Sequence, residues 1–200
     1  MNKILMATIV TLCLSGCAIH IGNIEPTAGE NASVTMGNIE VADNQNSGKL
    51  EASNGNVTLG HSAKAGKIEV MNGNIELADF SQAKSLETVN GNIEAGANVR
   101  VNGKAETVNG NIMFGQNATI GGSLSTTSGS ISLGQNSKIE GDIVFEEANG
   151  WGSNDNRKKP KLELAQGVTV NGQIHLYQPV TLLLPDSVDV SKVVRHYSDE

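Results

Sequence analysis

The 200-residue sequence is poor in aromatic residues, since Phe, Trp and Tyr together make up only 3% of it. Aromatic side chains supply much of the buried area in an ordinary globular core. This scarcity excludes a core built around large rings. The chain has to bury its apolar surface through small aliphatic side chains in an ordered arrangement.

Positive charge is also scarce. The chain has 14 Lys and Arg against 21 Asp and Glu, which gives a net charge of −7. Nucleic-acid binding needs a basic face, and so does electrostatic attraction to anionic lipid head groups. The composition therefore argues against a nucleic-acid partner and against membrane binding through charge alone.

The N-terminal residues have the pattern of an export signal. Lys3 is a short positive region, and the apolar stretch 4–14 is too short to span a bilayer as a helix. The segment Leu14-Ser15-Gly16-Cys17 that follows resembles the bacterial lipoprotein signal. That resemblance implies removal of residues 1–16, lipid on the sulfur of Cys17 and, since Ala18 replaces the Asp of retained lipoproteins, the outer membrane. The alternative is an ordinary secretory signal in which Cys17 occurs by chance.

Cysteine is nearly absent as well, with only Cys13 and Cys17. Cys13 would leave with the signal peptide and Cys17 would carry lipid. We expect no disulfide in the exported chain, so the fold has to be held by its core alone. Nothing in the sequence indicates a cofactor.

What the chain has in abundance is a repeat that contains glycine and asparagine. Gly37, Gly55, Gly73 and Gly91 are eighteen residues apart, and nineteen-residue steps lead to the Gly residues at 110 and 129. Most turns open with Gly-Asn-Ile or a close variant, such as the ETVNGNI that occurs at 87–93 and 106–112. A final turn begins at residue 161 and a degenerate first one at residue 22. A fixed period of this length is typical of a solenoid, and it predicts about eight turns.

Within each turn, apolar residues alternate with polar ones in three short segments. Period two indicates strands, and no window shows the 3.6-residue period of a helix. The sequence predicts an all-β, three-sided parallel β-helix with 18–19 residues per turn. The predicted inward columns are Ile39, Val57, Ile75, Ile93, Ile112, Ile131 and Leu162; Val41, Leu59, Leu77, Ala95, Phe114, Leu133 and Leu164; Val101, Ile120, Ile139 and Val170; and Leu50, Ile68, Leu86, Ala105, Leu124, Ile143 and Ile174.

The Asn-Gly pairs predict the corners, because both residues tolerate a left-handed backbone. Asn54, Asn72, Asn90 and Asn109 share the parity of the buried positions, and we expect their amides to form a ladder along the axis. The expected organisation is an N-terminal cap with a degenerate first turn over 17–36, a solenoid over 37–178 with an insertion at 148–160, and a C-terminal cap and tail over 179–200 that frays from His196.

The segments ETVNGNIEAG, EVMNGNIELA and TTSGSISLG resemble the repeats of bacterial adhesin-type β-solenoids. The segments SKIEGDIVF and VTVNGQIHL resemble bactofilins, which form polymers and are usually cytoplasmic. The first resemblance implies an exported, right-handed solenoid of the cell envelope, and the lipoprotein-like signal favours it. Neither resemblance implies a catalytic residue.

Outward positions on two sides carry columns of acidic residues, which are Glu40, Glu76 and Glu94, and Glu51, Glu69, Glu87 and Glu106. Stacked carboxylates about 5 Å apart repel unless something screens them. They could form a stripe for divalent cations or an acid pair, but a solvated face is the favoured interpretation, and no metal site is predicted.

Left-handed acyltransferase solenoids share the turn length and need a catalytic His. The positions of His20, His61, His175 and His196 indicate surface residues instead.

The insertion contains the only Trp, Trp151, and a basic run that includes Arg157, Lys158 and Lys159. Exposed aromatic and basic residues on a loop are typical of a partner contact. We expect these four residues to bind an envelope protein or an anionic glycan. The alternative is that the array merely tolerates the insertion.

These observations favour a lipid-anchored cell-envelope β-solenoid that acts as a non-enzymatic structural or adhesive module. An alternative is a bactofilin-like scaffold that self-associates through the ends of the solenoid. A weaker alternative is a carbohydrate-active β-helix enzyme.

Overall fold

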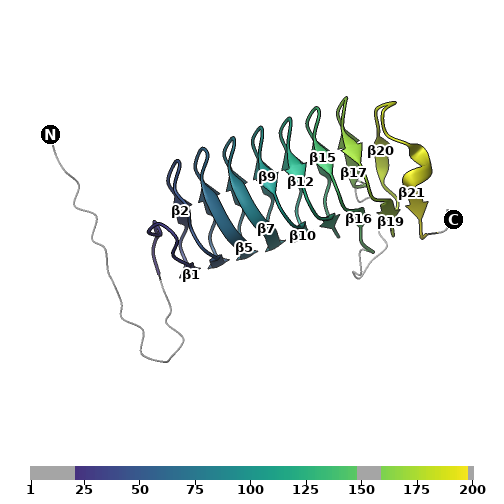
Figure 1. Cartoon of the computed structure of the whole chain (residues 1–200). Helices are drawn as coiled ribbons and strands as arrows, with labels where there is room; N and C mark the ends of the chain where they lie inside the picture. The colour runs from purple at the N-terminus through teal and green to yellow at the C-terminus, as the bar shows by residue number, and fades with distance from the viewer. Residues whose placement is uncertain (1–20, 148–158, 198–200) are drawn as a thin grey trace.

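The computed structural model describes residues 21–147 and 159–197, and in these ranges the chain is a rod of stacked turns (Figure 1). The rod is a parallel β-solenoid of about eight turns, which confirms the predicted fold class. The only helix in the described ranges is a short 3-10 helix, η1, at Val190–Lys192.

One side of the rod is an eight-stranded parallel sheet to which each turn contributes one strand. Ile112 pairs with Ile93 of the previous turn and Ile131 of the next, so identical positions stack directly. The strands are β2 (Ile39–Val41), β4 (Val57–Leu59), β6 (Ile75–Leu77), β8 (Ile93–Ala95), β11 (Ile112–Phe114), β14 (Ile131–Leu133), β17 (Lys161–Leu164) and β20 (Thr181–Leu183).

The other two sides belong to a single 13-stranded sheet. The long strands β5 (Lys64–Asn72) and β7 (Gln82–Asn90) run through both sides and join them. The second side holds β9 (Arg100–Val101), β12 (Thr119–Ile120), β15 (Lys138–Ile139) and β18 (Thr169–Val170). The third side holds β1 (Ala32–Met36), β3 (Leu50–Asn54), β10 (Ala105–Asn109), β13 (Leu124–Thr126), β16 (Ile143–Phe145), β19 (Ile174–Leu176) and β21 (Val193–Arg195).

The inward columns that the alternation predicts all lie in the core, and all of their members are buried except Ala95, which is half-buried. The third side adds a column that the sequence analysis did not predict, which holds the buried hydroxyls of Thr88, Thr107 and Thr126. Each of these threonines donates a hydrogen bond to a glycine carbonyl oxygen at the corner of the previous turn, over 2.9–3.1 Å. The hydroxyls therefore enter the core without an unsatisfied polar atom.

Two asparagine ladders hold the corner between the third and first sides. The predicted ladder is confirmed, because each amide donates to the asparagine of the previous turn: Asn72 to Asn54 over 3.1 Å, and Asn90 to Asn72 over 2.9 Å. These side chains are exposed, although their parity matches the buried positions. The second ladder was not predicted: the Oδ1 of Asn74, for example, accepts the backbone N–H of Asn92 over 2.9 Å.

The C-terminal residues continue both sheets. β20 pairs with β17, and β21 pairs with β19. The expectation that the chain frays from His196 is wrong for that residue, because its ring stacks on Tyr177 with 4.2 Å between centroids. The Nζ of Lys192 donates to the carbonyl oxygen of Val170 over 2.5 Å and so covers part of the open edge of β18.

The corner between the first and second sides needs a left-handed residue in each turn. Asn44, Ser62, Asn98, Asn117 and Asn136 fill this column with φ between 57° and 60°. In one turn the position is held by Phe80, which has φ 62° and is 49% exposed. A bulky side chain is costly in this conformation. Phe80 therefore strains the backbone at a place where most other turns use Asn.

We expect Phe80→Asn to be more stable than Phe80→Leu by about 1 kcal/mol, because Asn tolerates a left-handed backbone and Leu does not. Both variants lose the edge-on contact of Phe80 with His61, whose ring centroids are 5.3 Å apart, so that contact cancels in the comparison. Urea unfolding of the two variants measures the difference. Equal midpoints would show that the corner carries no strain at this position.

Candidate functional site

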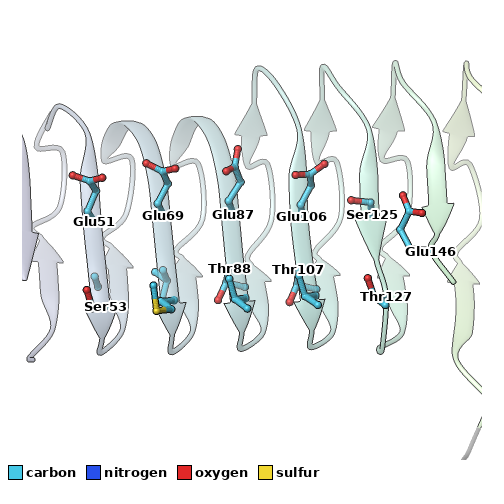
Figure 2. Close-up of a pocket in the computed structure, with 15 residues that line it drawn as sticks. Glu51, Ser53, Glu69, Glu87, Thr88, Glu106, Thr107, Ser125, Thr127 and Glu146 are labelled. Atoms are coloured by element: carbon cyan, nitrogen blue, oxygen red, sulfur yellow. The ribbon is translucent and has the colours of Figure 1, made fainter. Parts of the chain in front are cut away.

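The outer face of the third side carries interlocked columns of Glu and Lys. The carboxylates of Glu51, Glu69, Glu87 and Glu106 form one row across β3, β5, β7 and β10 (Figure 2). Lys49, Lys67 and Lys104 precede three of these acids by two residues and so lie on the same face of the strand.

Each lysine bridges two acids of neighbouring turns. Lys67 Nζ lies 2.8 Å from Glu69 Oε1 and 2.9 Å from Glu87 Oε2. Lys49 Nζ lies 2.6 Å from Glu51 Oε1 and 2.5 Å from Glu69 Oε2. Lys104 pairs with Glu106 and, at 3.4 Å, with Glu87. The ion pairs thus form a continuous network along four strands.

This network explains how stacked carboxylates can lie so close together. Hydrogen bonds from Lys49 and Lys67 hold the pKa of Glu69 below its usual value. Hydrogen bonds to Glu69 and Glu87 raise the pKa of Lys67. A carboxylate with a lowered pKa stabilises the fold above its ordinary pKa, and that contribution is lost as the pH falls through the lowered value. Lysine ammoniums therefore provide the screening that a stripe of metal ions would otherwise supply.

A groove of about 510 Å³ runs across the same face. The glutamate row lines one side of it, and Met71, Val89 and Val108, which are 42–56% exposed, line the other. The strand residues between these two rows, which include Thr88 and Thr107, form its base. Hydroxyl-bearing residues line its two ends, with Ser53 at one end and Ser125 and Thr127 at the other, and Glu146 lies beyond them (Figure 2). The groove crosses strands of six successive turns, from β3 to β16.

The outer face of the first side differs from this face. Glu76 pairs in register with Glu94, and no lysine bridge is found for either of them in the described residues. A hollow of about 460 Å³ lies over this region, beside Met113. Residues 21–147 and 159–197 contain no group of three or more His, Cys, Asp and Glu side chains that could hold a metal ion.

The residues predicted to bind a partner fall largely outside the described ranges. Trp151, Arg157 and Lys158 lie outside them, as does the predicted lipidation site Cys17. Lys159 is exposed and lies two residues before β17. The described residues therefore do not test whether these four residues lie together, and their role stays a prediction.

Two of the histidines lie at the C-terminal end of the third side. His175 projects from the outer face of β19, where its Nδ1 lies 3.0 Å from Nε2 of His196. His61 is exposed at the corner beside Phe80. Neither His61 nor His175 has an ion-pair partner among the described acids.

No family model, curated protein or solved structure matches this chain. Within the described residues, no helix is both long and apolar enough to cross a membrane.

Proposed function

We propose that this chain is a lipid-anchored, non-enzymatic module of the bacterial cell envelope, in which a rigid β-solenoid presents its flat faces to partners. The observation that carries this proposal is the regularity of the rod. The turns stack in register, with β-strand pairs along all three sides. A rod of this kind holds its outward side chains at fixed spacings, which suits a scaffold or a binding surface.

The arrangement of the acidic side chains also supports a binding role over an enzymatic one. A carbohydrate-active enzyme of the usual kind needs two carboxyl groups with separated roles across a bound substrate. In the glutamate row, each carboxylate is instead tied to a lysine ammonium, with Glu69 and Glu87 tied to two. This pairing suits a stable surface better than a general acid, which needs a raised pKa.

The polymer-forming alternative has its own support at the ends of the rod. β20 and β21 each pair with one strand, and no strand of the described ranges pairs with their other edges. Leu183 and Val190 at this end are 47% and 72% exposed. An open edge of this kind can template pairing with another copy. A molar mass that rises with concentration in light scattering would favour this alternative over the monomeric module.

Cys17→Ser tests the anchor. The variant should lose its lipid and appear in the soluble fraction of the envelope, because stable anchoring takes more than one acyl chain and Ser lacks the sulfur that would carry lipid. Mass spectrometry of the mature N-terminus and fractionation of cells measure both effects. Cys13→Ser is the matched control, and it should leave fractionation unchanged because residue 13 would be removed with the signal. A Cys17→Ser protein that remains with the membranes as the unaltered chain does would contradict the proposal.

A further inference from the structure

The groove on the third side has a chemical composition that fits one class of ligand. One side of it is a single row of aliphatic side chains, Met71, Val89 and Val108, with one contributed by each of three adjacent strands. Its other side offers a carboxylate on each of four strands, β3, β5, β7 and β10, and its ends hold hydroxyl-bearing residues. We propose that this groove binds a linear glycan built of amino sugars with free amino groups, which lies along the solenoid axis. The proposal rests on the proposed function and names the ligand class of that binding module.

The size of the groove favours a small linear ligand over a folded protein. Its volume of about 510 Å³ lies in the range of ligand pockets, which is roughly 300–1,000 Å³. A stable protein interface buries about 800 Å² on each partner, and a row of three aliphatic side chains cannot supply that area. An α-helix, which is about 10 Å across, is also too wide to enter the groove, because the glutamate row and the aliphatic row are two residues apart on each strand, about 6.6 Å.

The spacing of the groove favours a glycan over an extended peptide. Neighbouring strands are about 4.8 Å apart, and an extended peptide repeats its same-face side chains only every two residues, at about 6.6 Å. A peptide along the axis would therefore fall out of step with the strands after two turns. One pyranose ring and its linkage advance a chain by a distance close to one strand spacing. The apolar C–H face of each ring can pack against Met71, Val89 or Val108 while its polar groups contact the glutamate row.

The net charge beside the groove determines which kind of glycan it favours. The four carboxylates of the glutamate row outnumber the three ammoniums of Lys49, Lys67 and Lys104, and Glu146 adds a further negative charge. Glu51 and Glu106, at the two ends of the row, each pair with only one lysine in the described residues. An excess of negative charge repels uronic-acid chains and attracts ammonium groups. This preference is opposite to that of the basic insertion, for which the sequence predicts an anionic glycan.

The test is calorimetric titration of the full-length chain with a short glucosamine oligomer, its fully N-acetylated counterpart and a galacturonate oligomer. We expect the glucosamine oligomer to bind most tightly and the galacturonate oligomer not to bind. Affinity should fall as salt rises, because ions screen the ammonium–carboxylate contacts. Val89→Gln should weaken binding of the glucosamine oligomer by about fivefold, since it removes apolar contact area from the aliphatic side of the groove.

Matched variants separate a defined site from general attraction to an acidic protein. Met113 is a matched control for Val89, because it is about as exposed, at 41% against 43%, but lies on the outer face of the first side and not in this groove. Met113→Gln should therefore leave the affinity for the glucosamine oligomer unchanged. Glu106→Gln should weaken binding more than Glu76→Gln, although both remove one negative charge. Equal effects within either pair, no binding of glucosamine, or equal binding of galacturonate would each overturn the proposal. A lipid-anchored chain that binds none of these glycans would overturn the groove proposal alone, whereas Cys17→Ser fractionation tests the anchor independently.

Discussion

Gly91→Ala is expected to destabilise the solenoid by about 3 kcal/mol, because there is no room for a methyl group at this corner. A Cβ on Gly91 would lie 1.9 Å from the carbonyl oxygen of Gly73 and 2.5 Å from its carbonyl carbon. Both atoms belong to the backbone of the previous turn and cannot rotate away. The two turns would have to move apart, which would stretch the ladder bond from Asn90 to Asn72 and the hydrogen bond from Gly73 N–H to the carbonyl oxygen of Asn90. Urea unfolding measures the loss.

Gly29→Ala is the control that separates close approach from backbone strain. Gly29 has φ +83°, but no atom lies within 4 Å of an added Cβ. Gly91 has the opposite combination, with a φ outside the left-handed region and a severe contact. Gly29→Ala should therefore cost only about 1 kcal/mol, which is the price of a left-handed alanine. If the two variants lost equal stability, the glycine column would be explained by backbone conformation and not by the packing of turns.

The fold was predictable because each structural requirement recurs once per turn. A single Val or Ile at alternate positions says little, but Ile93, Ile112 and Ile131 at a constant period identify one inward column. The corner glycines were predictable for the same reason. Phe80 was not, since it departs from the column of asparagines in which it lies, and only the backbone geometry shows that it is left-handed.

The candidate groove was within reach of the sequence but was not predicted. In a strand, residues two apart face the same side, so Lys67 and Met71 had to flank Glu69 on the outer face. The pattern Lys-x-Glu in three turns was the signal for the ion-pair network, and Met or Val two residues after Glu was the signal for the aliphatic side of the groove. An acidic column considered alone shows neither its lysine partners nor its aliphatic neighbours.

The ends of the rod were the hardest part to predict, because periodicity stops there. The pairing of β20 with β17 depends on how the chain returns after the last regular turn, and no repeat specifies that path. His196 was expected in a frayed end, yet it lies against Tyr177 and His175. The aromatic contact is between residues that no common motif connects, so only the three-dimensional path of β21 brings them together.

Ile112→Asp is expected to have the largest effect of any single change considered. Ile112 is fully buried and stacks between Ile93 and Ile131 in the middle of the rod. An aspartate there would place a carboxylate with no partner among aliphatic side chains, at a cost of about 4 kcal/mol or more. Because each turn contacts mainly its neighbours, the loss should divide the array at this turn. Urea unfolding should then show an earlier and broader transition than that of the unaltered chain.

Met113→Asp is the matched control, since it introduces the same side chain one residue further along β11. Met113 faces outward and is 41% exposed, so the aspartate remains hydrated. It would lie beside Glu94 in the previous turn, and like charges at paired positions cost up to about 1 kcal/mol. The two variants should therefore differ by about 3 kcal/mol or more in unfolding free energy. Because they differ only in which face of the strand receives the charge, similar unfolding curves would show that the assignment of inward and outward faces is wrong.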